Sequence, residues 1–221
     1  DPLGIRRSVN GFLRILLKTN YSINLTQLIN TASRVISCKF HGLKDNKDGL
    51  SDCHLFFKEK LVSILKEDYG FEEILILSVL NNNKIINPYE ALKKIKSIET
   101  ILVNSDYHEL FSNAKRISNI LKKSNSNLSL NIKKNLLRES SEKILYNAIN
   151  GIRDELESSL EKNDYEEYFK KLNTLNDFIK IFFEEVMIND DDEDIRLNRL
   201  SLLYLINSYY KNIANFAILS H

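Results

Sequence analysis

The sequence has few residues that interrupt helices and no long apolar run. Among 221 residues there are only 6 glycines and 2 prolines, which are too few for the turns of a many-stranded sheet protein. Hydrophobic residues make up 43% of the chain and recur at helical spacing almost throughout, so a packed interior is expected. The sequence therefore predicts an all-α fold built as a helical bundle.

No apolar stretch is long enough to span a bilayer, and no charged-then-apolar leader precedes the first expected helix. The chain has only 2 cysteines, so a disulfide framework is not indicated. These absences lead us to expect a soluble cytoplasmic protein with reduced thiols. The first residue is Asp1 rather than Met, and we interpret the sequence as a fragment of a longer chain.

Ligands for a metal are also scarce, because the chain has only 4 histidines. The four residues that could form a zinc site are Cys38, His41, Cys53 and His54. Adjacent side chains leave a helix about 100° apart, so Cys53 and His54 cannot easily face one ion. No glycine-rich phosphate loop and no nucleophile with a paired base stands out either. We expect no catalytic residue, no metal and no cofactor in this chain.

Charge of one sign is not in excess, since the formal net charge is +1. Bulk charge therefore does not indicate a nucleic-acid partner. Residues 1–124 carry 19 lysines and arginines against 13 acids, whereas residues 125–221 carry 12 against 17. An RNA contact in the second half would need cations that are presented locally.

Helical periodicity is clear in the first hundred residues. A helix is predicted over residues 24–40, with one apolar face that we expect to be buried: Leu25, Leu28, Ala32, Val35 and Ile36. Asn87-Pro88 is typical of a helix start, with asparagine as the cap and proline at the first helical position.

The C-terminal stretch is predicted to form two amphipathic helices joined by an acidic turn at residues 189–194. Residues at helical spacing form the expected core of the first helix: Leu172, Leu175, Ile179, Phe182 and Val186. Residues from 195 onward repeat the pattern. The compact bundle should bury Ile117, Leu121, Phe182, Val186, Leu200 and Leu203.

Particular words in this stretch resemble a known family. They are Phe182-Phe183-Glu184-x-Val186-Met187 and Ile195-Arg196-x-Asn198-Arg199-Leu200. They resemble the end of the beta subunit of the bacterial two-subunit glycyl-tRNA synthetase, whose last helices form an anticodon-binding domain. Further matches occur in the same order, at Asp1-Pro2-x-x-x-Arg6-Arg7 and at residues 110–121. The resemblance covers nearly the whole chain.

The resemblance implies a division of labour along the chain. Residues 1–103 would be a helical region joining to the subunit body, and residues 104–221 would be the anticodon-binding domain. The alpha subunit of an alpha2-beta2 assembly would use ATP and Mg to activate glycine. This portion would hold tRNA(Gly) by its anticodon arm. Neither DNA nor a membrane is expected as a partner.

Three sets of polar residues are candidate tRNA contacts by the same resemblance: Arg196, Asn198 and Arg199; Lys115, Arg116 and Asn119; Arg6 and Arg7. Arginine suits unpaired RNA because its planar group bonds phosphates and base edges and stacks on bases. The alternative is structural, since Arg196 and Arg199 could pair with the acids at 190–194 and tie the helix to the acidic turn.

Two other functions fit some of these features. One is the anticodon-binding module of an arginyl-tRNA synthetase, which residues 110–121 resemble more loosely. The other is a helical scaffold that binds protein rather than RNA. The Asp-Pro-x-x-x-Arg-Arg and Phe-Phe-Glu-x-Val-Met words favour the glycyl family over the first of these.

Overall fold

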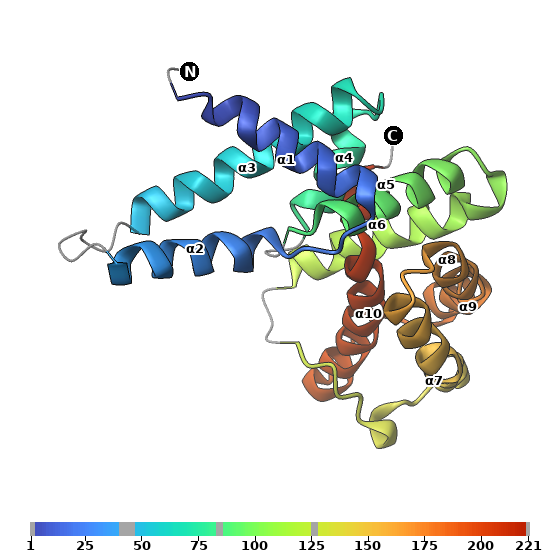
Figure 1. Cartoon of the computed structure of the whole chain (residues 1–221). Coiled ribbons are helices and arrows are strands. Elements are labelled where there is room, and N and C mark those ends of the chain that lie inside the picture. The colour runs from blue at the N-terminus through green and yellow to red at the C-terminus, as the bar shows by residue number, and fades with distance from the viewer. Residues whose placement is uncertain (1–2, 40–46, 83–85, 125–127, 220–221) are drawn as a thin grey trace. The chain divides into compact units, whose positions relative to one another are not determined.

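The computed structural model describes residues 3–39, 47–82, 86–124 and 128–219. Every regular element in these ranges is helical and none is a strand (Figure 1), which confirms the predicted all-α fold. The chain divides into two compact units, called here unit 1 (Asp1–Ile98) and unit 2 (Glu99–His221). Within the described ranges, no helix combines the length and apolar character needed to cross a membrane.

Unit 1 is built around its longest helix. The elements are α1 (Ile5–Thr19), α2 (Leu25–Lys39), α3 (Lys47–Glu67), α4 (Glu73–Leu80) and most of α5 (Pro88–Leu102). Helix α3 packs against α1, α2 and α4. Fully buried Leu13, Leu61 and Ile95 belong to its core. A paired contact between Arg14 and Asp68 fixes α1 to the end of α3, with nitrogen–oxygen distances of 2.6 and 3.0 Å.

The ends of these helices follow from local sequence. The Asn87 side chain accepts a hydrogen bond from the backbone N–H of Glu90 at 3.3 Å, which confirms the predicted cap of α5. Gly70 has φ +77°, a left-handed conformation that lets the chain turn back after α3. Asp1 and Pro2, which belong to the first family match, lie outside the described residues, and the first described helix begins at Ile5.

Helix α2 is less buried than the sequence predicts. Its bounds agree closely with the predicted 24–40, and Leu25 is buried. Leu28, Val35 and Ile36, however, are 42%, 46% and 50% exposed. The periodicity correctly identified an apolar face of α2. The prediction that this face is buried was wrong, because α2 packs mainly against one helix, α3. Between the two helices lies an apolar groove of about 540 Å³.

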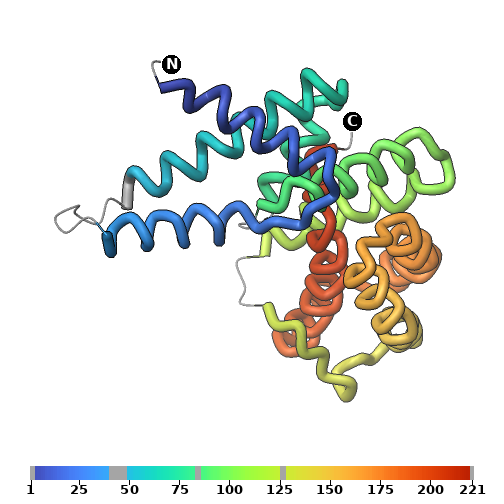
Figure 2. Tube along the Cα trace, in the orientation of Figure 1, coloured from blue at the N-terminus to red at the C-terminus, as the bar shows by residue number. Residues whose placement is uncertain are grey.

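Unit 2 contains the remaining helices. They are α6 (His108–Lys123), α7 (Ser140–Glu161), α8 (Tyr165–Asn173), α9 (Asn176–Glu185) and α10 (Glu193–Ile213), with short 3₁₀ segments Ser105–Tyr107, Lys134–Leu136 and Phe216–Ile218. Helix α10 lies against α6 and α7, and α7 packs on α8 and α9 (Figures 1 and 2). Of the predicted core, five residues are buried and Leu121 is half-buried: the five are Ile117, Phe182, Val186, Leu200 and Leu203.

The first of the two predicted C-terminal helices is in fact two. After α8 the backbone N–H groups of Thr174 and Leu175 bond to carbonyls three residues back, at 3.2 and 3.1 Å. This tighter turn ends α8. The side chain of Asn176 then donates to Asn173 at 2.8 Å and accepts from Asn113 of α6 at 3.0 Å. The break therefore lets α8 and α9 follow different directions while both keep their apolar faces buried.

The sequence placed a domain boundary near Asn104, whereas the compact units divide between Ile98 and Glu99, inside α5. Asn104 itself caps the 3₁₀ segment after α5, where its side chain accepts from the N–H of Asp106 at 3.0 Å.

Candidate nucleic-acid interface

One helix of unit 2 carries more positive than negative charge. Residues 99–221 contain 16 lysines and arginines against 20 acids, yet α6 alone carries four cations and one acid, Glu109. The four cations are Lys115, Arg116, Lys122 and Lys123. Arg116, Asn119, Lys122 and Lys123 are exposed and Lys115 is half-buried. We call these five residues the α6 strip, a local basic surface on an acidic unit.

Arg116 is held by an aromatic ring. Its guanidinium carbon lies 3.8 Å from the ring centroid of Phe183, on α9, and cations at this distance are attracted by the ring electrons. Phe183 in turn contacts the buried Phe182 at a centroid distance of 5.7 Å. The residue is nevertheless exposed, so its planar group is pre-ordered and remains accessible to a base or a phosphate.

Lys115 stands at the edge of a hollow. It lines a volume of about 420 Å³ together with His108, Phe111 and Asn104. The hollow therefore combines cationic, aromatic and amide groups on the same side of unit 2. Asn119 follows Lys115 by one turn, which places both side chains on one side of α6.

Arg199 is located differently from the sequence-based expectation. Only 4% of it is exposed, and its guanidinium makes three hydrogen bonds within the protein. Its Nε donates to a carboxylate oxygen of Glu142 at 2.5 Å, and its Nη1 donates to the carbonyl of Met187 and to Asp190, both at 2.7 Å. Arg199 therefore ties α10 to α7 and to the acidic turn, and the predicted RNA contact gives way to the structural alternative.

Glu142 is the partner that sequence reasoning missed. It is fully buried and sits in the first turn of α7. Its second oxygen accepts from the backbone N–H groups of Arg138 and Glu139, at 2.5 and 2.8 Å. A glutamate three residues after the helix cap is a known sequence signature of a helix start. That signature does not reveal the arginine 57 residues away that completes the pair.

Asp190 belongs to the same cluster. The backbone N–H of Asp192 donates to it at 3.0 Å. This hydrogen bond, together with the charge of Arg199, holds the pKa of the Asp190 carboxyl below its usual value. The ionised form of the Asp190 carboxyl is thus favoured by the groups that it binds.

Asn198 and Arg196 are also used by the fold. Asn198 is buried and makes two hydrogen bonds to the backbone of Lys133, accepting at 2.8 Å and donating at 3.1 Å. Arg196 is half-buried and donates to the carbonyl of Asp190 at 2.8 Å. Both ends of the Asn198 amide are thus bonded within the fold, and its contact with RNA stays a prediction. Arg196 is the one member of this set with part of its side chain at the surface.

Arg6 and Arg7 are exposed on α1. They belong to unit 1, so the structure does not bring them together with the α6 strip within one compact unit.

The possible zinc ligands are not gathered in the described part of the chain. Cys38 is exposed and Cys53 is half-buried, while His54 shares a hydrogen bond of 3.0 Å with Asn30. His41 lies outside the described residues. Among the residues that the structure describes, no group of three or more potential metal ligands comes together.

A comparison with protein families gives this helical unit a relative. Residues 110–216, which lie wholly within unit 2, match the DALR anticodon binding domain. Unit 2 is therefore similar to anticodon-binding domains of the DALR type over these residues.

Comparison with individual proteins extends the similarity to unit 1. The chain is 27% identical over 217 residues to the glycine–tRNA ligase beta subunit of Desulforapulum autotrophicum, covering 98% of this chain and 31% of that protein. The same subunit of Thermodesulfovibrio yellowstonii is 29% identical over 98% of this chain and 30% of its own length. That of Vibrio vulnificus is 27% identical, over 99% and 32%.

The chain thus resembles the C-terminal part of the glycine–tRNA ligase beta subunit, including its anticodon-binding domain. It spans about a third of the length of these relatives.

Proposed function

We propose that this chain binds the anticodon arm of tRNA(Gly) through unit 2 and so positions the tRNA for glycylation by an alpha subunit, in an alpha2-beta2 ligase of the cytoplasm. The observation that carries the proposal is the match of residues 110–216 to an anticodon-binding domain. The α6 strip supports it, because cations gathered on one helix attract an RNA loop even where the unit as a whole is acidic. ATP, Mg and glycine are used by the complete enzyme and not by this chain.

The α6 strip replaces Arg199 and Asn198 as the centre of the proposed contact. Arg116 is its best-ordered member, since Phe183 holds it. Binding at a distance from the reacting end contributes to rate by placing the terminal adenosine, so the expected kinetic effect is on tRNA and not on glycine activation.

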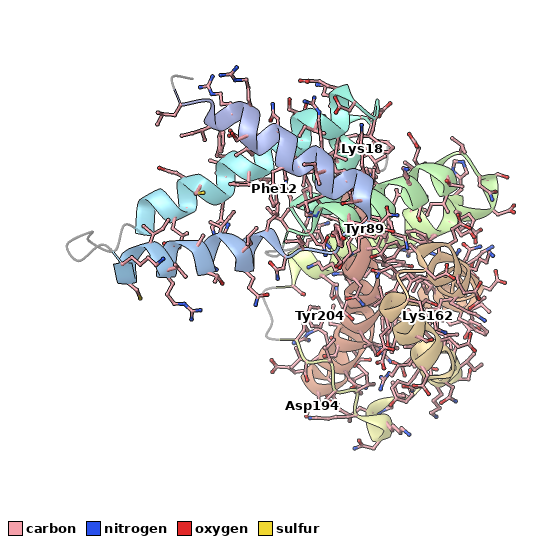
Figure 3. All side chains as sticks on the ribbon, viewed as in Figure 1. Phe12, Lys18, Tyr89, Lys162, Asp194 and Tyr204 are labelled. Carbon is pink, nitrogen blue, oxygen red and sulfur yellow. The ribbon has the colours of Figure 1, made fainter. Side chains whose placement is uncertain are left out.

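A binding titration tests this proposal. The chain is mixed with labelled tRNA(Gly) transcript, with a transcript whose anticodon is replaced, and with each again after Arg116→Ala. We expect Arg116→Ala to weaken tRNA(Gly) binding by about five- to tenfold, as for loss of a stacking or charged contact. Lys162→Ala is the matched control, because Lys162 is an exposed lysine at the end of α7 in the same unit (Figure 3).

Absence of binding by the unaltered chain would refute the proposal. An equal loss of tRNA(Gly) affinity in the Lys162→Ala control would mean that removing any cation of unit 2 weakens binding, and that Arg116 makes no specific contact. A second measurement is glycine-dependent exchange between ATP and pyrophosphate, which should stay at background for this chain alone and reach the unaltered rate in a complete enzyme carrying Arg116→Ala.

For unit 1 we propose the role of a helical support that joins the anticodon-binding domain to the body of a beta subunit. The support for this is the uncovered apolar face of α2, with Leu28, Val35 and Ile36 exposed, together with relatives about three times as long. Apolar faces of this kind are usually covered by a partner surface. Amide hydrogen exchange in α2 should therefore be much slower in a complete beta subunit than in this chain. Equal exchange rates in the two would contradict the proposal.

A further inference from the structure

A second polar hollow lies in unit 2, between the C-terminal halves of α6 and α10. Its volume is about 440 Å³, within the range of roughly 300–1,000 Å³ that small-molecule sites occupy. The described residues that line it include two lysines, Lys122 and Lys211, and no acid. A hollow with two lysines and no acid is unusual in a unit where acidic residues outnumber lysines and arginines. We call it the α6–α10 groove.

Asn207 is the residue that marks the groove as a site. It lies on α10, lines the groove and is only 7% exposed. Its side chain makes no hydrogen bond with the described part of the chain, and its amide atoms are not among the buried side-chain atoms left without a partner there, so they reach the solvent in the groove. The other two buried asparagines of unit 2 behave differently, since Asn176 and Asn198 are each bonded through both ends of the amide. An amide that opens onto a groove and is not used by the fold offers a donor and an acceptor side by side to a ligand.

The neighbours of Asn207 have the chemistry of a nucleotide site. Tyr204 precedes it by three residues and Lys211 follows it by four, so all three share one side of α10. Tyr204, half-buried, is seen beside α10 in Figure 3. An aromatic ring stacks on an unpaired base, an amide bonds a base edge through adjacent donor and acceptor, and a lysine neutralises phosphate. Asn215, a second amide, stands at the end of the groove.

The groove also continues the α6 strip. Lys122 belongs to both, and it follows Asn119 by one turn on the exposed side of α6. An RNA loop lying along the α6 strip therefore reaches the groove without leaving unit 2.

We propose that the α6–α10 groove receives one unpaired nucleotide of a single-stranded RNA loop. Asn207 reads the edge of the base, Tyr204 stacks on its face, and Lys122 and Lys211 neutralise its phosphates. This inference rests on the proposed function, and it adds a residue that discriminates between bases to a surface that otherwise attracts any RNA.

Discrimination is what separates this role from a structural one. Asn207→Leu keeps the approximate volume and removes the amide, and Asn150→Leu is the matched control, because the Asn150 side chain only bonds a carbonyl of its own helix, α7. Each variant is titrated with tRNA(Gly) transcript and with transcripts carrying one changed base at each position of the anticodon loop. Lys122→Ala, an exposed position, is measured in parallel.

We expect Asn207→Leu to bind tRNA(Gly) about tenfold more weakly and to lose the preference for the natural base at one loop position, as for loss of a base contact. Lys122→Ala should weaken all transcripts alike. The melting temperature of Asn207→Leu should not fall, because no protein hydrogen bond is removed. If Asn207→Leu proves unfolded, Lys211→Ala decides, because Lys211 is exposed and lines the groove but does not belong to the α6 strip; it should weaken binding as Lys122→Ala does, and unchanged affinity would overturn the groove assignment.

Unchanged affinity and unchanged base preference in both groove variants, with tRNA still bound, would overturn the groove assignment and leave the proposed function standing. Failure of the unaltered chain to bind any tRNA would instead overturn the proposed function, and the groove assignment with it.

Discussion

At the scale of single residues, the buried pair of Arg199 and Glu142 is the strongest constraint in unit 2. Both side chains are almost inaccessible to solvent, and removing one partner of such a pair leaves the other charged and uncompensated. We expect Arg199→Ala to lower the free energy of unfolding by about 3–5 kcal/mol, measured by urea denaturation. The double variant Arg199→Met with Glu142→Leu should recover only part of the loss, because Glu142 also accepts from the backbone N–H groups of Arg138 and Glu139.

A loss below about 1 kcal/mol for Arg199→Ala would show that the ion pair is not formed in solution. Arg116→Ala serves as the comparison at this scale, since an exposed arginine on the surface of the same unit should change stability by less than about 0.5 kcal/mol.

The Asp190 carboxyl gives a prediction about pH. Its pKa is lowered in the folded protein by the hydrogen bond from Asp192 and by the charge of Arg199. A lowered folded pKa contributes stability that is present above the unfolded value, near pH 4, and is lost as pH falls through the folded value. Asp190→Asn should therefore reduce the loss of stability on acidification. Asp177→Asn, at an exposed position outside this cluster, is the control, and identical acid profiles for both variants would contradict the assignment.

At the scale of elements, the core face of α9 can be tested by two adjacent residues. Phe182 is fully buried and Ile181 is 40% exposed. Phe182→Ala should destabilise by about 3–5 kcal/mol, whereas Ile181→Ala should cost less than about 1 kcal/mol. Urea denaturation of the two variants measures the difference. Similar losses in both would mean that the two faces of α9 are equally covered.

Elements were predicted from sequence with uneven success, and the reason is physical. Periodicity gives the face of a helix, so Phe182, Leu200 and Leu203 could be assigned to the core in advance. Periodicity does not say which other element packs on that face. The exposure of the apolar face of α2 could therefore not be predicted from the sequence. The break between α8 and α9 was missed because Leu172, Leu175 and Ile179 keep helical spacing across it.

The candidate site was harder to predict for a related reason. Arg199 and Asn198 lie on the side of α10 that meets Glu142 and Lys133, which are 57 and 65 residues away in the chain. Only the three-dimensional structure shows these partners, and without them a polar residue in a family motif is easily taken for a ligand contact. The α6 residues could be proposed from sequence because their exposure depends on the spacing within one helix and not on a distant partner.

At the scale of the whole molecule, the α6 strip sets the expected salt dependence of tRNA binding. Each phosphate contact to a single strand contributes a slope of about −0.7 to log affinity against log salt, so the few cations of α6 predict a slope of about −2 to −3. Lys122→Ala should make the slope shallower by about 0.7. Arg116→Ala should leave it nearly unchanged if Arg116 stacks on a base, and titrations at four or more salt concentrations distinguish these results.

A slope near zero would show that binding does not depend on phosphate contacts. A slope far steeper than about −3 would mean that cations beyond α6 take part, for instance Arg6 and Arg7 of α1.

The uneven charge of unit 2 also bears on how quickly and how selectively RNA arrives. Outside α6 the unit carries 12 cations and 19 acids, so a polyanion approaching those faces is repelled, while one approaching α6 is attracted. Repulsion of this kind lowers the rate of unproductive encounters and discourages competing nucleic acids. The excess of acids in unit 2 thus favours encounters in which the RNA meets α6. A more basic unit would bind RNA faster but would accept more orientations of the RNA.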